Sequence, residues 1–423
     1  MPGQYKHLCR ILAENPENEV VFLTKPKPKV SIPNVTKVEY EIKREPSPET
    51  HRYLIPFERG VFAGQEIWRV CKQLKLKGFT PDVIVGHLGW GEGMFLKDIF
   101  HDVPVLTFME YFYSAYGADV AFLEEEKNWD DDNRARIRMK NALHFFNLEY
   151  SDWCITPTWF QLERHPKEYH GKFSVLHDGI DTDVVKPPEQ LKKKLSLPNG
   201  VTLGPEDEII TYISRNFEPY RGFPQFMRAA EQILKERPKA HIIMVGQDGV
   251  SYGTAPENGK TWRQVMMEEV SLDESRFHVL GFLPHEQMVQ IMHHSQAHIY
   301  LTVPFVLSWS MMESMAAGCL LIASDTEPVR EVVTHEENGL LVDFFSQDEL
   351  VAALHRASDH QDELKPLRQA ARQTVLDRYA LDKVMPLHIQ LVEDLARGQN
   401  PPDAAEAIRK FDLATRKKQA KAA

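Results

Sequence analysis

The sequence predicts an α/β protein with two domains, each built around a parallel β-sheet that helices cover on both faces. Short segments rich in Val and Ile alternate with longer segments of helical periodicity, which is the pattern of βαβ units. A stretch rich in Pro, Lys and Gly at 185–206 interrupts the series once. We interpret it as an inter-domain connection without strands. With 423 residues, 43% of them hydrophobic, the chain can form two sizeable cores.

The first series of elements precedes residue 185. The segment 81–86 reads as a buried parallel strand, with Pro81 outside the ladder, where its missing N–H costs nothing. The strands expected in this series are 20–24, 35–42, 82–86, 103–108, 153–156 and 174–177. Helical patterns between them include 65–78 and 133–149.

The second series follows the connection. Its expected strands are 208–213, 240–245, 277–280, 297–301, 320–323 and 339–342, and its helices include 224–237 and 285–294. We expect an N-terminal domain over 1–185 and a second domain over 186–380. Residues 381–423 are expected to form a helix that packs back toward the N-terminal domain, and a solvated tail.

Charge and composition exclude several classes of function. Fifty Lys and Arg against 61 Asp and Glu give a net charge of −11, whereas a dedicated nucleic-acid binder carries a basic excess. The four cysteines form no CxxC pair and suit free thiols in a reducing cytosol. No secretory h-region and no apolar run of about 20 residues is visible, so we expect a cytoplasmic protein.

Two basic segments have two interpretations each. Arg134, Arg136, Arg138 and Lys140 precede apolar residues on one helical pattern, and Lys72, Lys75 and Lys77 close another. They can be solvated faces whose cations favour helix C-terminal ends. Alternatively, they can face an anionic lipid or sugar-phosphate acceptor.

The stretch 301–330 carries the first candidate site. Ser308, Trp309 and Ser310 fall at a helix start, where Ser is a favoured N-cap and exposed backbone N–H groups can bind an anion. Glu313 lies one turn into the same helix and could accept hydrogen bonds from ligand hydroxyls. The alternative is a first-turn carboxylate that only stabilises the helix dipole.

A second candidate is the strand-to-helix loop at 214–223. Arg215 and Arg221 lie six residues apart in it and could hold a diphosphate through bidentate contacts. The alternative is a pair of surface arginines in a turn.

Two further motifs read as structural at least as readily as functional. In His177-Asp178-Gly179-Ile180-Asp181, Gly179 permits a tight turn and Asp181 can cap the following segment. Asp130-Asp131-Asp132 precedes a helix and fits an acidic N-terminal turn better than a metal motif.

The order of these motifs is distinctive. HDGID, SRNFEPYRG, VLGFLP at 279–284 and SWSMMESMAAG follow one another as in the retaining glycosyltransferases of family 4, which the chain resembles from about Pro2 to about Leu395. That family has the GT-B fold, in which two Rossmann-like domains face an inter-domain cleft. The segment TPTWFQLERHP and the turn Pro2-Gly3-Gln4 resemble a mostly bacterial subgroup tied to surface-polysaccharide genes.

The resemblance implies roles for individual residues. Arg215 matches the arginine on the donor diphosphate, and Arg221 stands where the family usually has a lysine. Glu313 matches the glutamate that holds the donor ribose. Phe305 replaces its partner glutamate and Met109 replaces a histidine, whereas the neighbouring Glu110 remains as a carboxylate at the cleft. The other implied residues are Gly281, Phe282 and Leu283 around the nucleotide base, and Gly3 and Gln4 with Phe305 on the acceptor or cleft side.

The implied function is transfer of a hexose from a nucleoside-diphosphate sugar to a hydroxyl of a glycan or glycolipid, with Arg215, Arg221 and Glu110 as the catalytic set. The resemblance implies no metal ion and no other cofactor, and it allows a peripheral contact with the inner membrane. Two alternatives remain. One is another GT-B enzyme, such as a sugar phosphorylase or an epimerase. The other, motivated by Phe305 and Met109, is a non-catalytic nucleotide-sugar-binding protein.

The start of the chain gives a last expectation. In proteins of this resemblance a buried strand leads into the Pro-Gly-Gln turn, but here Met1 directly precedes Pro2. We therefore expect the numbered chain to lack that strand through truncation. Residues 20–24 should then miss a partner on one side, and residues 2–4 should lie close to the cleft.

Overall fold

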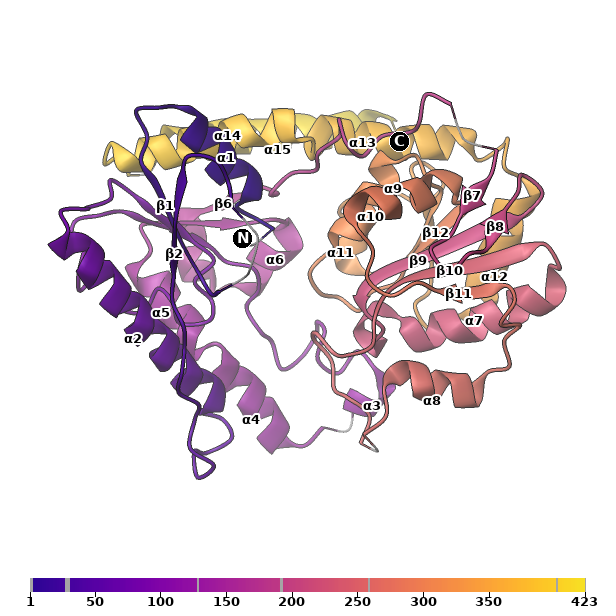
Figure 1. Cartoon of the computed structure of the whole chain (residues 1–423), viewed down its shortest axis with the longest axis horizontal. Coiled ribbons are helices and arrows are strands. Elements are labelled where there is room, and N and C mark those ends of the chain that lie inside the picture. Colours follow the sequence, from indigo (N-terminus) through magenta and orange to yellow (C-terminus); the bar gives the residue numbers. More distant parts are fainter. Residues whose placement is uncertain are drawn as a thin grey trace. The chain divides into compact units, whose positions relative to one another are not determined.

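The chain folds into two compact units. The structure, a computed structural model, describes residues 3–26, 31–127, 129–190, 193–257, 259–400 and 402–422. The first unit comprises Met1–Gly117, Asn128–Gly179 and Leu381–Ala423, and the second comprises Ala118–Lys127 and Ile180–Ala380. Each unit contains parallel β-sheet and helices (Figure 1), which confirms the predicted α/β class.

The strands of the first unit form two parallel sheets. The larger has the order β3-β4-β5-β6, and the smaller is the pair β1-β2. The bounds are β1 (Val20–Thr24), β2 (Val35–Glu39), β3 (Ile84–Gly86), β4 (Val105–Phe108), β5 (Trp153–Thr156) and β6 (Phe173–Val175). Every residue of β1 pairs with β2, and the other edge of β1 has no strand partner in the described residues. Pro2 lies outside the described residues.

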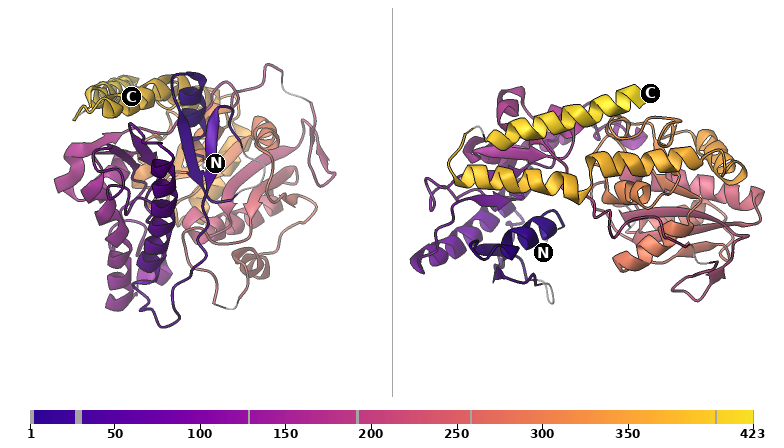
Figure 2. Two further views of the ribbon diagram at one scale, coloured as in Figure 1. Left: turned by 60° about the vertical axis from the view of Figure 1, so that its left-hand side comes forward. Right: turned by 90° about the horizontal axis from the view of Figure 1, so that it is seen from above.

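The C-terminal helices complete the first unit. α14 (Leu381–Ala396) packs on β4 and on α1 (Lys6–Glu14), and α15 (Asp403–Ala422) lies beside α14 (Figure 2). Their apolar side chains share one core cluster with Leu106 and Phe108 of the sheet. The other helices of this unit are α2 (Ile55–Leu76), α4 (Asp131–Lys140), α5 (Ala142–Tyr150), α6 (Trp159–Arg164) and the 3-10 helix η1 (Lys167–Lys172).

The second unit has a six-stranded parallel sheet of order β11-β10-β9-β12-β13-β14. When the six strands of this sheet are counted in chain order, their order is 3-2-1-4-5-6, the doubly wound order, whose switch point falls between β9 and β12. The bounds are β9 (Glu208–Asn216), β10 (Ala240–Gln247), β11 (Phe277–Val279), β12 (Ala297–Tyr300), β13 (Leu321–Ser324) and β14 (Leu340–Val342). β12 and β13 are buried on every residue, and β9 and β10 on most of theirs, as expected for a sheet covered on both faces.

Helices cover both faces of this sheet (Figure 1). α7 and α12 pack together on one face, and α10 packs on β12, β13 and α13 on the other. The helices of this unit are α3 (Glu124–Lys127), α7 (Phe223–Glu236), α8 (Trp262–Glu269), α9 (His285–His294), α10 (Trp309–Ala316), α11 (Glu327–Arg330), α12 (Gln347–Asp359), α13 (Lys365–Arg378) and the 3-10 helix η2 (Pro219–Arg221).

The stretch 185–206 is not a strand-free connection, and this expectation was wrong. It contains the antiparallel pair β7 (Leu195–Ser196) and β8 (Thr202–Leu203), and Val185, Leu195 and Leu203 belong to the core cluster of the second unit. The longer segment of that unit begins at Ile180. A two-residue strand shows no alternation that a sequence pattern could reveal.

A short segment from the first half of the sequence also belongs to the second unit. Residues 118–127 lie against it, and the ring of Phe122 has its centroid 5.2 Å from Phe344 and 5.1 Å from Phe345. The hydroxyl of Tyr220 donates to Asp119 Oδ2 at 3.3 Å. The expected domain ranges placed residues 118–127 in the N-terminal domain, whereas they belong to the second unit.

Candidate active site

A cavity lies at the switch point of the second unit, beyond the carboxyl ends of β9 and β12. Open α/β sheets bind ligands at this place. The residues around it are both polar and apolar, and they come from both strands and from the loops that follow them. Its lining includes Tyr212, Ser214, Arg221, Tyr300, Leu301, Ser308 and Ser310. The structure therefore brings Arg221 together with two of the three predicted helix-start residues.

The cation in this cavity is Arg221, which is only 7% exposed. Its Nη1 donates to Tyr300 Oη at 3.1 Å, to Thr302 Oγ1 at 2.8 Å and to the carbonyl oxygen of Val306 at 2.9 Å. All three acceptors are neutral groups. Within the described residues no carboxylate oxygen lies within the 4.0 Å of an ion pair. The buried carboxylate of Glu218 acts on the guanidinium only from beyond that distance, and it is already bonded to backbone N–H groups. The guanidinium therefore lacks a directly bonded anion, which a negatively charged ligand would supply.

Gly222 allows Arg221 to reach this position. Its φ of +62° is left-handed, and a Cβ there would lie 2.3 Å from Leu301 Cβ. A glycine therefore satisfies both the backbone turn and the close approach of η2 to the segment after β12. The hydroxyl of Tyr212 adds a hydrogen bond to the Arg221 carbonyl at 2.8 Å.

Tyr300 connects the arginine to the start of α10. Its hydroxyl oxygen also accepts from the backbone N–H of Ser308 at 2.8 Å. Burial raises the pKa of Tyr300 although the charge of Arg221 opposes this, so the phenol stays neutral and does not cancel the charge of the guanidinium. Ser308 is the N-cap of α10 and accepts from Ser310 N at 3.3 Å, as predicted. Trp309 is 39% exposed beside it.

Glu218 was not singled out in the sequence, although it holds a loop whose Tyr252 ring lies against Arg221. It is 1% exposed, and its carboxylate accepts from the backbone N–H groups of Ser251, Tyr252 and Gly253 at 3.0–3.2 Å. The ring of Tyr252 is thereby held with its centroid 5.2 Å from Arg221 Cζ. A cation over an aromatic face is stabilised without being neutralised.

Phe305 is packed instead of exposed. It is 4% exposed, and its ring centroid lies 5.0 Å from that of Tyr252 and 5.9 Å from that of Tyr220. The side chain therefore packs against Tyr252 and Tyr220. The prediction that Phe305 lies on the acceptor or cleft side does not agree with this burial.

Glu313 pairs with a residue that the sequence pattern did not reveal. Its Oε1 lies 2.7 Å from Nε2 of His285, and its side chain is 16% exposed. The first turn of α10 contains no acidic residue, so the alternative of a first-turn carboxylate is wrong. His285 begins α9 directly after the VLGFLP turn, and this position was the only available signal.

The three residues expected around a nucleotide base differ in their surroundings. The Gly281 carbonyl accepts from Gly246 N at 3.0 Å, Phe282 is 78% exposed, and Leu283 is buried. Arg215, at the end of β9, is exposed and has no hydrogen-bond or ion-pair partner in the described residues. It does not line the cavity around Arg221.

In the first unit, Glu110 lies beside a histidine. His87 follows β3 and Glu110 follows β4, and Nε2 of His87 is 3.3 Å from Glu110 Oε2. Met109 is buried, and its backbone N–H donates to Ile155 O at 2.8 Å. His87 was missed because a single histidine has no periodicity. Its place directly after a predicted strand was the available signal.

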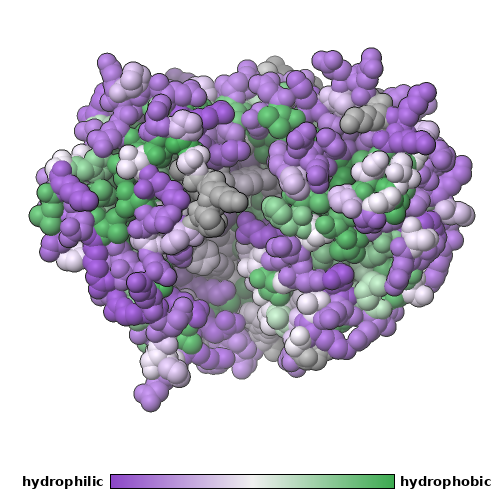
Figure 3. Space-filling model, viewed as in Figure 1, coloured by the Kyte–Doolittle hydropathy of each residue, from purple (hydrophilic) through white to green (hydrophobic). Residues whose placement is uncertain are grey.

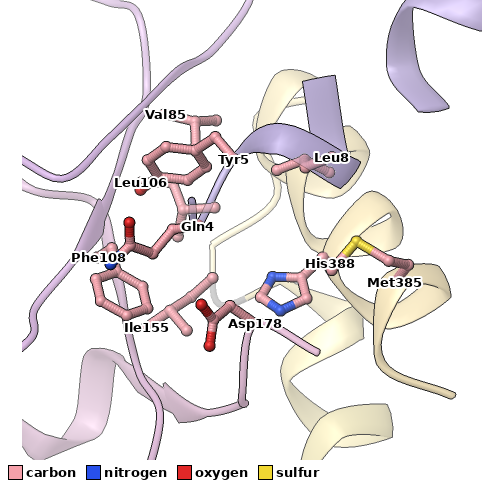
Figure 4. A pocket seen from close by; sticks show the side chains of 10 residues that line it. All are labelled: Gln4, Tyr5, Leu8, Val85, Leu106, Phe108, Ile155, Asp178, Met385 and His388. Atoms are coloured by element: carbon pink, nitrogen blue, oxygen red, sulfur yellow. The ribbon is translucent and has the colours of Figure 1, made fainter. Parts of the chain in front are cut away.

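Gln4 lines a second, mostly apolar cavity in the first unit. Figure 4 shows its side chain beside Phe108, with Asp178 and His388 nearby. The other residues around this cavity are Tyr5, Leu8, Val85, Leu106, Ile155 and Met385. Gly3 is exposed, and its carbonyl accepts from Lys6 N at 3.3 Å.

Comparison with known families decides the identity. The model described as "Glycosyl transferase family 4 group" matches residues 16–185, and the model described as "Glycosyl transferases group 1" matches residues 200–374. The two matches follow each other in the order that the motifs predicted.

The chain belongs to the family 4, group 1 glycosyltransferases.

Solved structures agree with the GT-B fold of this glycosyltransferase. Sucrose-phosphate synthase from Thermosynechococcus elongatus is similar with a TM-score of 0.71 and 19% identity over 94% of each chain. HepE from Anabaena in complex with UDP-glucose has a TM-score of 0.61 and 15% identity over 90% of this chain and 99% of its own. A glycosyltransferase from Rickettsia africae has a TM-score of 0.56 and 14% identity over 86% of each chain. Among curated proteins, none matches the chain in sequence.

The HDGID motif at 177–181 and the acidic motif at 130–132 both form hydrogen bonds that stabilise the fold. The carbonyl of His177 pairs with His388 Nε2 at 3.0 Å, which ties this motif to α14, and Asp181 Oδ1 accepts from Val184 N at 3.2 Å. Asp130 is the N-cap of α4 and accepts from Asn133 N at 2.8 Å. In the described ranges, no group of three or more His, Cys, Asp and Glu side chains is placed to hold a metal ion.

The basic segments are partly engaged with aromatic rings. Arg134 Cζ lies 4.9 Å from the centroid of Tyr116, and Lys72 Nζ lies 4.9 Å from that of Trp68. Figure 3 shows mainly hydrophilic residues on the viewed face, interrupted by smaller apolar patches. Among the described helices, none combines the length and the apolar character that crossing a membrane requires.

Proposed function

We propose that this glycosyltransferase transfers a hexose, with retention of anomeric configuration, from a nucleoside-diphosphate sugar to a hydroxyl of a glycan or lipid-linked acceptor. The second unit would bind the donor and the first unit the acceptor. The observation that carries the proposal is the buried Arg221 at the switch point of the larger sheet of the second unit. The three groups that accept hydrogen bonds from its Nη1 are all neutral. The UDP-glucose in the HepE complex supports a donor of this class.

Breaking the bond between the sugar and the diphosphate leaves negative charge on the departing phosphate. Arg221 and the positive end of the α10 helix dipole would stabilise that charge, and their shared contacts with Tyr300 fix their positions before the ligand arrives. Arg215 would add a second, exposed cation. Retention without a protein nucleophile fits attack from the face that the phosphate leaves.

The nucleoside would be held by the surrounding residues. Glu313 would accept hydrogen bonds from the ribose hydroxyls while His285 fixes one of its oxygens. The segment from Gly281 to Leu283 would contact the base, with Phe282 as an exposed ring for stacking. The proposal includes no metal ion, and EDTA should leave the rate unchanged.

On the acceptor side, Glu110 would receive a hydrogen bond from the acceptor hydroxyl, and Gly3 and Gln4 would contribute to the same surface. A role in bacterial surface-polysaccharide synthesis at the cytoplasmic side of the inner membrane completes the proposal. The exposed Phe145 and Phe146 of α5 support a peripheral membrane contact, because they follow the basic α4 directly.

The proposal is tested first by the donor. A ligand that binds only the folded state raises the unfolding temperature, so UDP-, GDP- and ADP-sugars should be screened by thermal shift. We expect one base to stabilise the wild type and Arg221→Met to lose that stabilisation. Proton NMR of the product should then show the anomeric configuration of the donor. Donor binding without transfer or hydrolysis would favour the non-catalytic alternative, and release of sugar-1-phosphate with inorganic phosphate would favour a phosphorylase.

A further inference from the structure

The pair of His87 and Glu110 lies at the carboxyl ends of two neighbouring strands. β3 and β4 pair in parallel, with Gly86 opposite Thr107, so the residues that follow them emerge side by side. The side chain of Glu110 is 33% exposed and that of His87 is 18% exposed. The carboxylate therefore forms the outer member of the pair and the imidazole the inner one.

The loop after β3 holds His87 against the protein. A Cβ on Gly89 would lie 3.2 Å from Cε1 of His144 and 3.8 Å from Cε1 of His87, so this glycine leaves the two rings their space. A Cβ on Gly91 would come within 2.3 Å of the backbone of Gly60 in α2. The loop is thus packed tightly onto a long helix, which is a rigid base for a positioning residue.

The surroundings of His87 favour its charged form. Burial lowers the pKa of His87, but the hydrogen bond and the charge of Glu110 outweigh it, so the pKa lies above the usual value. Glu92, on the same loop, acts in the same direction. Burial and the charge of His87 lower the pKa of His144 on α5 to about 4, so that ring is neutral at neutral pH.

Two buried polar atoms in this neighbourhood have no hydrogen-bond partner among the described residues. They are Oε2 of Glu92 and Nδ1 of His144. Native proteins seldom leave such atoms unsatisfied, so this neighbourhood holds more polar groups than its own contacts satisfy. The exposed carboxylate of Glu110 is the group of the pair that a hydroxyl of a polyhydroxylated ligand can reach.

We propose that His87 is a positioning residue for acceptor binding: it orients the Glu110 carboxylate so that Glu110 accepts a hydrogen bond from a sugar hydroxyl of the acceptor. This inference rests on the proposed function, in which the first unit binds the acceptor. His87 acts through Glu110 and does not touch the acceptor itself.

The test uses octyl β-D-glucoside as the acceptor probe and the imidazole signals of the labelled full chain in NMR. The His87 signal is assigned by its loss in His87→Gln, which keeps a donor close to the position of Nε2. We expect the probe to shift the His87 signal in the wild type. In Glu110→Gln the probe should shift no imidazole signal, and the affinity should fall about tenfold, as for the loss of one charge-assisted hydrogen bond.

A second measurement separates positioning from folding. His87→Ala should weaken probe binding about tenfold, whereas His87→Gln should restore most of the affinity and remove its dependence on pH between 6 and 8. The exposed His101 in the same unit supplies the matched control, and His101→Ala should bind as the wild type does.

UDP-glucose binding to the second unit is measured in parallel and should not change in any of these variants. If the wild type does not bind UDP-glucose, that result contradicts the proposed function and not this inference. A wild-type His87 signal that octyl β-D-glucoside leaves unshifted, or equal probe affinities for wild type and His87→Ala, would overturn the inference.

Discussion

Nη1 of Arg221 lies 3.1 Å from the hydroxyl oxygen of Tyr300, and this single contact links the cation of the donor cavity to the strand that ends beside it. The same oxygen accepts from Ser308 N, so the arginine and the start of α10 share one anchor. Two groups suited to an anion are thereby fixed relative to each other before any ligand binds.

Removing the Tyr300 hydroxyl should disturb both groups at once. Tyr300→Phe leaves the Ser308 N–H and one direction of the guanidinium without their acceptor, so we expect a loss of roughly 1–3 kcal/mol in the free energy of unfolding. Donor affinity should also decrease. Tyr212→Phe is the matched control, because that hydroxyl bonds the Arg221 carbonyl and not the guanidinium or Ser308 N. Urea unfolding and donor titration measure both effects, and equal donor affinities for the two variants would contradict the shared anchor.

Arg215 and Arg221 should respond differently to salt. Arg215 is exposed, so Arg215→Ala should weaken donor binding about tenfold at low ionic strength, and the difference from wild type should shrink as salt screens the charge. The loss in Arg221→Lys should persist, because Arg221 is buried. Parallel salt series of donor binding measure this, and unfolding of Arg215→Ala should match the wild type. The same salt dependence for both variants would show that Arg215 and Arg221 do not differ in this way.

Glu313 should recognise the ribose. Glu313→Gln should bind UDP several-fold more weakly than the wild type but should bind 2′,3′-dideoxy-UDP about equally well, because the analogue lacks the hydroxyls that the carboxylate would accept. His285→Ala should show a smaller loss, since it removes only the partner that holds Oε1. Calorimetry with both nucleotides measures the discrimination. A wild type that does not distinguish UDP from its dideoxy analogue would contradict the assignment.

The pair of His87 and Glu110 should make stability depend on pH. The folded-state pKa of His87 is raised, so its contribution to stability is fully present below the unfolded value of about 6.5 and is lost as pH rises through the folded value. Glu110→Gln should therefore be destabilised most below pH about 6.5, and the difference from wild type should shrink at higher pH. Urea unfolding across this range measures it. A difference that grows with pH would have the wrong sign.

The sequence predicted the buried parallel strands of the second unit to within three residues at each end, because apolar β-branched runs between turns leave few alternatives. Helices of the first unit were harder. The helix expected at 65–78 in fact begins at Ile55. Its first ten residues were not predicted to be helical, because Pro56 and two glycines there are typical of a loop. The helix expected at 133–149 is two helices that meet at Asn141, whose side chain bonds both backbone groups of Tyr113.

The candidate site was predicted where residues stand at helix starts and strand ends. Arg221, Ser308 and Ser310 meet around one cavity because the doubly wound order brings β9 and β12 together, which no local pattern reveals. His87, Glu218 and His285 escaped notice because each acts through one distant partner. A side chain that pairs with a residue far along the chain leaves no periodic signal.

Arg221 is proposed to bind the diphosphate of a nucleotide-sugar donor, and isothermal titration of UDP-glucose into wild type, Arg221→Lys and Arg221→Met measures this binding. We expect the wild type to bind, Arg221→Lys to bind more weakly, and Arg221→Met to lose at least tenfold in affinity, as follows when about 1.5–3 kcal/mol of charge-assisted bonding is removed. Equal affinity of the folded Arg221→Met variant and the wild type would contradict it.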